Sequence, residues 1–250
     1  MRSFRTRLRA ASRAHVGATM RCVAFSPLLL LVACALRPPQ LQPAPYHVVV
    51  KSVRLPERDW LPWYTRCAEH AWVDVKDAAG WHRVEWNQRL DHVRVEPMSG
   101  EVAGHDLRWE EGVAVWACYR GERARELAAA ILATAKAYPD ATNYRAWPGP
   151  NSNTFVEWLA QETGLPLVMP PSAIGKDYTP WLRAGFTSSR TGIEVETMLL
   201  GAQVGLCEGA ELHLLGLTLG VGLWPPALKL PFLPAIPGGW FAPGSDPTGI

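Results

Sequence analysis

The chain has 250 residues, 48% of them hydrophobic, and the 217 from Cys34 onward are enough for one domain with a sizeable core. Its formal net charge of +2 at pH 7 originates at the N-terminus, since six of the 25 basic residues and no acidic residue precede Cys34. The remaining part carries 19 basic and 23 acidic side chains, a net charge of −4. This balance lacks the basic surface on which nucleic-acid binding depends, so we expect no nucleic-acid partner.

Residues 1–33 have the composition of a secretory leader. An arginine-rich stretch is followed by a 13-residue apolar run, CVAFSPLLLLVAC, which is too short for a membrane-spanning helix of roughly 20 residues. The last four residues of the run, LVAC, resemble the lipobox of bacterial lipoproteins, in which the leader is cut before the cysteine and the cysteine is acylated. We therefore predict a leader over 1–33 and a lipid, such as palmitate, on Cys34. An ordinary secretory signal is the alternative, and Met20 is a second candidate for the first residue of the protein.

A lipid on Cys34 would hold the chain on a membrane surface, because two or more acyl chains are enough for stable anchoring. An alanine follows Cys34, and the sorting rule for lipoproteins of Gram-negative bacteria then favours the outer membrane over the inner one. We expect an envelope lipoprotein that faces the periplasm. Its partners would be the membrane, through the lipid, and an envelope component or peptide. Residues 34–46 are rich in proline and predict a stiff tether between lipid and domain.

Residues 47–230 predict a single α+β domain. Runs of β-branched and aromatic residues, two of them flanking a turn at 77–80, indicate strands. The predicted strands cover 46–53, 69–75, 81–86 and 112–120. The C-terminal third, 191–230, is also β-rich and contains many glycines, which occur where strands bend or backbones approach closely.

Two helices are predicted in the middle of the chain. The segment GERARELAAAILATAKAYP has an apolar stripe of helical period that includes Leu127 and Ile131, and Pro139 ends it. The segment NTFVEWLAQETG predicts a second helix that ends at Gly164. The expected fold is a mostly antiparallel sheet with two packed helices. Residues 231–250 are so rich in proline and glycine that we expect a disordered tail.

Three cysteines remain after the leader and Cys34: Cys67, Cys118 and Cys207. In an oxidising compartment they allow three different single disulfides, each of which leaves one thiol over. Three buried unpaired cysteines are equally compatible with the sequence.

The segment WPGPNSNTF leads into the second predicted helix and combines turn residues with hydroxyl and amide side chains. Thr154 and Glu157 fit a capping box, and Asn151 or Asn153 fits the N-cap, so the polar residues have a structural explanation. The same position favours chemistry, because the positive end of a helix dipole stabilises a nucleophile or an oxyanion. We therefore consider Ser152 as a nucleophile, Asn151 and Asn153 as binding residues, and backbone N–H groups near Asn153 as oxyanion donors.

A base for Ser152 is expected on the first hairpin. If residues 77–80 form its loop, residues pair where their numbers sum to 157. His70 then lies opposite Asn87, with Glu85 one pair along on the same face. We predict His70 as the general base, oriented through its second nitrogen by Glu85 or by Asn87, which is also a candidate binding residue.

Other chemistries find less support in the sequence. Cys67 is three residues from His70, so on a regular strand the two side chains point to opposite faces. The set of Cys67, His70, His82 and His92 lacks the spacing of a metal site, and we expect no metal and no cofactor. The segment SAIGKDY lacks the spacing of a phosphate-binding loop, and Lys176 is expected instead to line a binding groove, with a solvated loop as the alternative.

Three motifs, AWPGPNSNTF, PSAIGKDY and GLTLGVGLWPPALKLP, together resemble an uncharacterised bacterial family, the domain of unknown function 3750, over roughly residues 48–230. A more distant resemblance is to permuted papain-like proteins, which include NlpC-type peptidases and the lecithin retinol acyltransferase group. These place a histidine on an early strand and later an NCxxF segment that opens a helix. Here EHAW would supply His70, and NSNTF aligns Ser152 with the cysteine.

The replacement of cysteine by serine leaves two hypotheses. A serine must lose its proton during attack and needs a stronger oxyanion hole than a thiolate does. The chain is then either a noncatalytic binding or scaffolding lipoprotein that keeps a former active site as a cleft, or a serine-dependent hydrolase or acyltransferase. The second would act on amide or ester bonds of the envelope, with Ser152, His70 and Glu85 as its catalytic residues.

Overall fold

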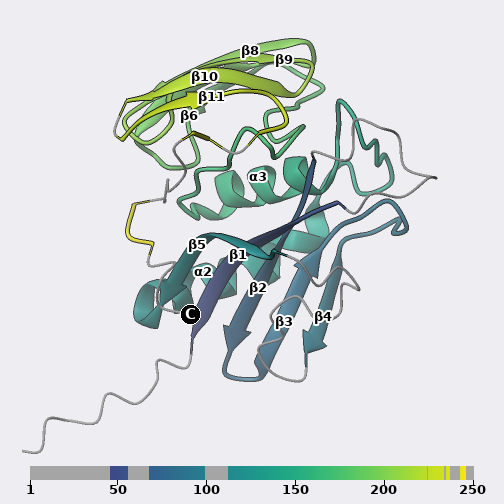
Figure 1. Cartoon of the computed structure of the whole chain (residues 1–250). Helices are drawn as coiled ribbons and strands as arrows, with labels where there is room; N and C mark the ends of the chain where they lie inside the picture. Colours follow the sequence, from purple (N-terminus) through teal and green to yellow (C-terminus); the bar gives the residue numbers. More distant parts are fainter. Residues whose placement is uncertain are drawn as a thin grey trace, which may run out of the picture. The chain divides into compact units, whose positions relative to one another are not determined.

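The computed structural model describes residues 46–55, 68–98, 112–223, 225–233, 235–236 and 243–245 (Figure 1). Contacts divide the chain into two units, Met1–Leu41 and Gln42–Ile250, and every described residue belongs to the second. The predicted leader, the predicted lipidation site Cys34, the tether up to residue 45, and Cys67 lie outside the described residues.

The first sheet has five antiparallel strands in the order β4-β3-β2-β1-β5 (Figure 1). These strands are β1 (His47–Arg54), β2 (Glu69–Asp77), β3 (Gly80–Glu85), β4 (Arg94–Met98) and β5 (Ala114–Arg120). The four predicted strands are confirmed. Strand β4 was missed, because its sequence, RVEPM, mixes a proline with charged side chains.

The hairpin of β2 and β3 has the predicted register. Val73 pairs with Val84, and the numbers of all paired residues in the hairpin sum to 157. Val73 and Val84 belong to the main hydrophobic core, which the sheet shares with both helices. His70 and Glu85 are out of phase with these core residues, and His70, the second residue of β2, lies at the end of the sheet where that strand begins.

Two helices pack on the core face of this sheet. They are α2 (Gly121–Thr134), which continues into the 3-10 helix η2 (Ala135–Ala137), and α3 (Ser152–Thr163). Leu127 and Ile131 of the predicted stripe are buried in the core. Helix α3 ends at Gly164, which adopts the left-handed conformation with φ of 66°, so the predicted helix end is also confirmed.

The C-terminal third forms a second, separate sheet of six antiparallel strands in the order β11-β10-β9-β8-β7-β6. Its strands are β6 (Arg183–Phe186), β7 (Gly192–Glu196), β8 (Leu200–Gly205), β9 (Gly209–Leu214), β10 (Leu217–Leu223) and β11 (Pro226–Lys229). Each strand therefore pairs with its neighbours in the sequence. The α+β class and the β-rich C-terminal part are confirmed, with two sheets.

Helix α3 lies between the two sheets (Figure 1). At its first turn, the Asn153 side chain donates a hydrogen bond of 2.9 Å to the backbone oxygen of Glu69 at the start of β2. At its last turn, Gln161 donates one of 2.8 Å to the Glu194 carboxylate on β7. The helix is thus bonded to the first sheet at one end and to the second sheet at the other.

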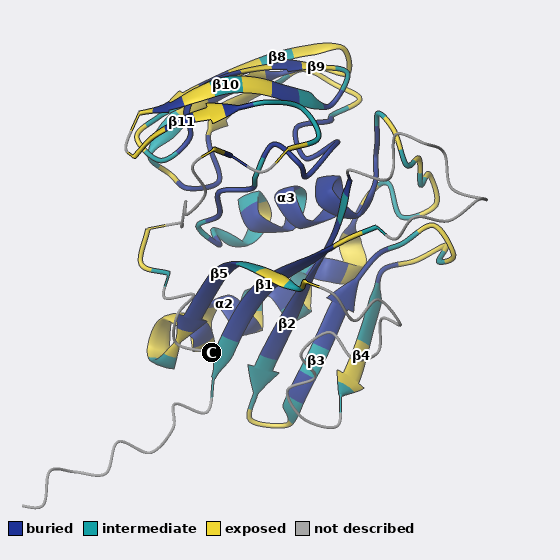
Figure 2. Cartoon of the chain, in the orientation of Figure 1, coloured by how far each residue is buried: buried dark blue, intermediate teal, exposed yellow. Residues whose placement is uncertain are grey.

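The second sheet has an inverted distribution of side chains (Figure 2). Along its central strands, side chains that face α3 are polar or charged and buried, such as Glu196, Gln203 and Glu211. Those on the other face, such as Val204 and Leu212, are apolar and exposed. Glycines leave room for the buried carboxylates: a Cβ atom at Gly201 would lie 1.6 Å from Oε2 of Glu196.

Part of the predicted disordered tail and two of the three cysteines lie among the described residues. In the predicted disordered tail, Ile236 bridges to Leu228, and the Ser245 hydroxyl accepts a 2.8 Å hydrogen bond from the backbone N–H of Cys118. Among the described residues, Cys118 and Cys207 are not joined by a disulfide. Within the same residues, every helix is too short or too polar to cross a bilayer.

The close approach of the Glu196 carboxylate to Gly201 can be tested by measuring protein stability. We expect Gly201→Ala to lower the free energy of unfolding by about 1–3 kcal/mol, because the added methyl group must displace the buried Glu196 carboxylate. Gly185→Ala on β6 is the matched control, since nothing lies within 4 Å of its Cβ position. Urea unfolding of both variants measures the difference. Equal stability of the two variants would show that Glu196 does not occupy this space.

Candidate functional site

The N-terminus of α3 is held by a capping box centred on Asn151. Its side-chain oxygen accepts hydrogen bonds from the backbone N–H groups of Asn153 at 2.9 Å and Thr154 at 3.1 Å. In return, the Thr154 hydroxyl accepts one of 3.0 Å from the backbone N–H of Asn151. The predicted box of Thr154 with Glu157 is therefore wrong, and of the two predicted N-cap residues Asn151 is the one used.

Ser152 and His70 line the same pocket. Its volume is about 30 Å³, and Glu69, Tyr144 and Asn153 are among the other residues that line it. Both Ser152 and His70 are buried. A pocket of this size has room for about two water molecules. The fold thus brings the predicted nucleophile and the predicted base to one cavity, although they are 82 residues apart in the chain.

His70 is oriented by Glu85. Its Nε2 atom lies 2.9 Å from Oε1 of Glu85, and both side chains are buried. Asn87 donates to the same carboxylate oxygen at 3.0 Å, and Arg94 approaches the other oxygen at 2.6 Å. Of the two predicted orienting residues, Glu85 contacts the imidazole and Asn87 contacts Glu85. The Nδ1 atom is therefore the ring nitrogen that would have to act on Ser152.

The partners of Glu85 keep it ionised. Burial would raise the pKa of this carboxyl, but the hydrogen bond and charge of His70, helped by Arg94 and Asn87, hold the pKa far below its ordinary value.

Tyr144 is a pocket residue that the sequence did not reveal. Burial raises the pKa of its phenol above the ordinary value, while hydrogen bonds from the hydroxyl and the backbone N–H of Ser152 oppose the shift. Its ring packs edge-on against Trp86, with centroids 4.9 Å apart. Tyr144 lies in the loop between the helices, where no periodicity marks it. It places a neutral phenol beside Ser152.

The backbone donors predicted for the oxyanion are already used. The N–H of Asn153 is bonded to the Asn151 side chain, and so is that of Thr154. The Asn153 amide donates to backbone oxygens of Glu69 and Ile174, each at 2.9 Å. Its buried side-chain oxygen has no hydrogen-bond partner among the described residues. Oxyanion stabilisation near Ser152 would therefore have to come from other donors.

Lys176, predicted to line a groove, lines a second pocket of about 10 Å³ and not the Ser152 pocket. Its side chain is buried in a cluster of charged residues. It lies 2.7 Å from Oδ1 of Asp177 and 3.1 Å from Oε2 of Glu211. Lys229 also contacts Glu211. Such buried pairs are stable only when each charge has partners, so Lys176 has a structural explanation.

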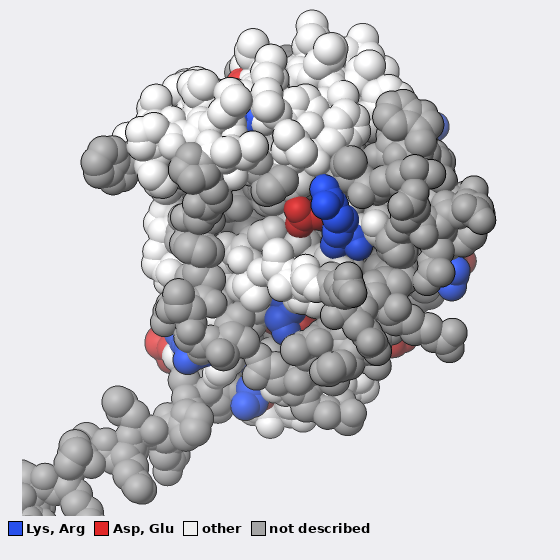
Figure 3. All heavy atoms as spheres, viewed as in Figure 1, with Lys and Arg blue, Asp and Glu red and all other residues white. Residues whose placement is uncertain are grey.

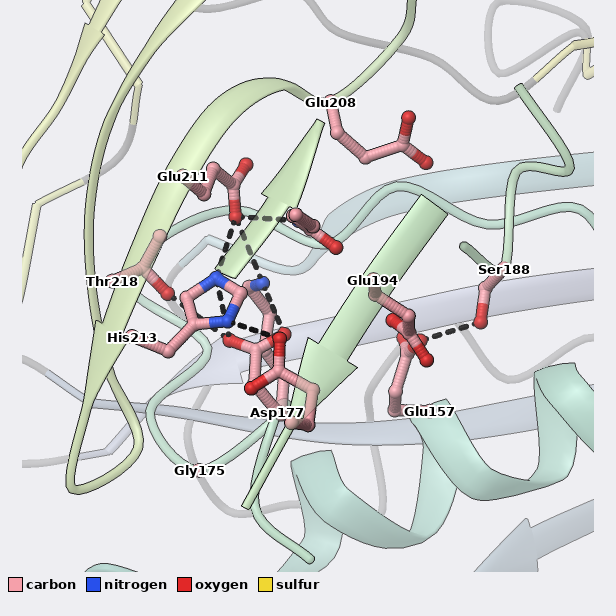
Figure 4. Close-up of polar contacts among 12 residues, drawn as sticks. Glu157, Gly175, Asp177, Ser188, Glu194, Glu208, Glu211, His213 and Thr218 are labelled. Atoms are coloured by element: carbon pink, nitrogen blue, oxygen red, sulfur yellow. Dashed lines mark hydrogen bonds and ion pairs between the residues drawn. The ribbon is translucent and has the colours of Figure 1, made fainter. Parts of the chain in front are cut away.

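His213 occupies the centre of this cluster (Figure 4). Its Nδ1 atom lies 2.6 Å from Glu196, and its Nε2 atom lies 3.1 Å from Glu211 and 3.3 Å from Asp177. Burial would lower the pKa of His213, but the charge of Asp177 and the bonds to both glutamates raise it to about 9. Asp177, Glu196 and His213 offer ligand atoms within 4.8 Å of one another. With both ring nitrogens on carboxylates and Lys176 beside them, this donor set fits an imidazolium better than a metal ion.

A second part of the cluster joins the carboxyl groups of Glu157 and Glu194. The Ser188 hydroxyl donates a 2.5 Å hydrogen bond to Glu157, and Gln161 bridges Glu157 and Glu194. Burial and the nearby charge of Glu194 raise the pKa of Glu157 to about 7. Strand alternation places Glu194 and Glu196 on one face of β7, since they are two residues apart.

Residues 51–178, just over half of the chain, match the family model described as "Protein of unknown function (DUF3750)". No curated protein and no solved structure matches the chain. The matched segment contains all the residues that line the Ser152 pocket and ends at Tyr178, before the second sheet begins.

The raised pKa of Glu157 predicts a pH dependence of stability. The folded chain holds this proton up to about pH 7, whereas an unfolded glutamate loses it near 4.5. This contribution is therefore fully present below pH 4.5 and is lost as the pH rises to about 7. In Glu157→Gln we expect the free energy of unfolding to fall less over this window, because the amide is neutral throughout.

Urea unfolding at several pH values measures this slope. Glu162→Gln, which removes an exposed charge from the same helix, is the control and should keep the wild-type slope. His213, with its pKa of about 9 against 6.5 when unperturbed, should cause a further fall between these values in all three proteins. An unchanged slope between pH 4.5 and 6.5 in Glu157→Gln would contradict the assignment.

Proposed function

Since the chain belongs to the DUF3750 family of proteins of unknown function, we propose its function from its own residues: a serine-dependent hydrolase or acyltransferase, held on the bacterial envelope by a lipid. The observation that carries the proposal is that Ser152 and His70 line one pocket while Glu85 contacts Nε2 of the imidazole. The order of histidine, orienting carboxylate and helix-opening nucleophile also fits the resemblance to permuted papain-like proteins.

In the proposed reaction, the Ser152 hydroxyl attacks an acyl carbonyl carbon, and Nδ1 of His70 takes the hydroxyl proton. Glu85 stabilises the imidazolium that forms, through its bond to Nε2. When the tetrahedral intermediate collapses, the carbon–nitrogen or carbon–oxygen bond breaks, and His70 returns the proton to the leaving amine or alcohol. Water or an acceptor hydroxyl or amine then releases the acyl group from Ser152 by the reverse sequence.

The oxyanion would be stabilised by the phenol of Tyr144. This side chain lines the pocket together with Ser152, and burial raises the pKa of the phenol, so that it keeps its proton for the oxyanion. The proposed roles of Asn151 and Asn153 are to fix the helix end and the pocket wall.

A noncatalytic binding pocket is the second candidate. It is favoured by the small volume of the cavity, about 30 Å³, and by the occupation of the Asn153 and Thr154 N–H groups by Asn151. In this case the unpaired side-chain oxygen of Asn153 would accept a hydrogen bond from a ligand. The two candidates differ in whether Ser152 forms a covalent bond.

The location of the protein is proposed from its N-terminal sequence. The leader over 1–33, the LVAC motif and the proline-rich segment 34–46 support an envelope lipoprotein that faces the periplasm, with the outer membrane favoured by the alanine after Cys34. An envelope peptide or ester would then be the accessible substrate.

Labelling with a fluorophosphonate probe tests the catalytic proposal. We expect the wild-type chain to be labelled and Ser152→Ala not to be labelled, because the probe bonds to an activated serine oxygen. Ser172→Ala, which alters another buried serine, should be labelled like the wild type. His70→Gln should slow labelling by about 10²–10⁴-fold. Absence of label on a folded wild-type chain would favour the noncatalytic pocket.

Globomycin, which blocks the lipoprotein leader peptidase, tests the anchor. We expect the wild-type chain to incorporate labelled palmitate and to accumulate as a longer precursor when globomycin is present. Cys34→Ala should lose both responses, because the acylated thiol is gone. Cys22→Ala, in the same apolar run, should retain both. Palmitate on the Cys34→Ala chain would contradict the assignment.

A further inference from the structure

The outward face of the second sheet is a continuous aliphatic surface. Its central positions are Val195, Val204, Leu212, Leu219, Val221 and Leu228, and their side chains are 47–64% exposed. Register places them next to one another: Val204 and Val221 both pair with Ala210, and Val221 also pairs with Leu228. We call these six residues the aliphatic face.

The exposed part of this region carries no charge. Residues 191–228 contain no lysine or arginine. Their four acidic residues, Glu194, Glu196, Glu208 and Glu211, are all buried on the inner face, as is His213. Figure 3 shows the surface over these strands as predominantly uncharged in that view.

The aliphatic face is not part of the hydrophobic core of the domain. The inner side of the sheet meets α3 through polar contacts, such as the hydrogen bond that Gln161 donates to Glu194. The apolar side chains of the sheet therefore remain on the outside. Because removing apolar side chains from water is favourable, a surface of this kind favours contact with an apolar phase.

We infer that the aliphatic face lies on a lipid bilayer and contacts its hydrocarbon region. Sheets that face lipid alternate in this way, with apolar side chains toward the lipid and polar ones toward the interior. The hydrocarbon region of a bilayer contains no charges and no hydrogen-bonding groups. The six side chains of the aliphatic face are likewise uncharged and form no hydrogen bonds. Trp181, which is 79% exposed just before β6, is the type of residue enriched at the membrane–water interface.

A second copy of the chain fits this surface less well. Protein interfaces contain about one hydrogen bond per 100–200 Å² and are enriched in tyrosine, tryptophan and arginine. The aliphatic face consists of leucine and valine alone. It therefore matches hydrocarbon in composition more closely than it matches a protein surface.

The length of the tether also supports the inference. This part of the argument rests on the proposed lipid anchor at Cys34. Twelve residues, 35–46, separate Cys34 from β1. Fully extended they reach roughly 40 Å, about the size of a small domain. An acylated Cys34 would therefore keep the domain close enough for one of its faces to touch the bilayer throughout.

Depth-dependent fluorescence quenching tests the contact. An environment-sensitive fluorescent amino acid replaces Leu212 in the full chain, which is bound to phosphatidylcholine vesicles with or without lipids that carry a doxyl quencher in the acyl chain. We expect the doxyl lipids to quench this residue. The same fluorescent residue in place of Glu126, exposed on α2, should not be quenched. Far-UV circular dichroism confirms that both variants fold.

Two results would overturn the inference. One is a vesicle-bound chain whose label at position 212 is no more quenched than the label at position 126. The other is a blue shift at position 212 that needs no vesicles and grows with protein concentration, because that is the signature of a second copy. Val221→Glu should reduce the quenching at position 212, because a charge on this face opposes contact with hydrocarbon.

The Cys34→Ala chain separates this inference from the proposed anchor. If the anchor proposal fails, palmitate is absent from the wild-type chain while quenching at position 212 persists. If the inference fails, palmitate is present and the chain is recovered with the vesicles, but position 212 is not quenched. Quenching in both the wild-type and the Cys34→Ala backgrounds is the expected result, since the contact is made by the sheet itself.

Discussion

The side chain of Asn151 is the interaction on which the arrangement of the pocket depends. Its oxygen caps α3, and its amide donates to the backbone oxygens of Ala146 at 3.1 Å and Ile174 at 2.9 Å. It therefore joins the helix to the loops before and after it. The fit is close enough that a Cβ atom at Gly175 would lie 2.5 Å from the amide nitrogen. Because Ser152 follows Asn151 directly, this capping fixes where the serine lies relative to β2.

Helix α3 then separates two regions of different chemistry. Toward the first sheet, a small cavity is lined by Ser152, His70 and Tyr144, a set of residues that suits acyl transfer. Toward the second sheet, carboxylates, lysines and an imidazolium bond to one another beside a pocket of about 10 Å³. Replacing one member of such a network leaves another charge buried without a partner, so the network fixes the position of the sheet on the helix. The sheet in turn presents its apolar side chains outward.

The sequence predicted those features that follow from periodicity. The register of β2 with β3 follows from a short loop and alternation, so the contact of His70 with Glu85 could be foreseen. The burial of Leu127 and Ile131 follows from helical period. Contacts between distant segments could not be foreseen in this way, and Tyr144 in an irregular loop is the clearest case.

Alternation also has a limit that the second sheet illustrates. It shows that two faces of a strand differ, but it does not show which face points inward. The buried cluster around His213 was missed for this reason, and so was the role of Lys176 as a partner of Glu211. The capping partner of Thr154 was misassigned because glutamate three residues later fits the same motif as asparagine three residues earlier.

The separation between Ser152 Oγ and His70 Nδ1 in an experimental structure is the most direct measure of the central claim. A complex with a phosphonate bound at Ser152 would place the groups in their working positions. The account predicts a heavy-atom distance within hydrogen-bond reach, about 2.6–3.2 Å, directly or through one water molecule. A distance beyond about 7 Å with no water between them would contradict it and leave Ser152 as part of the helix cap alone.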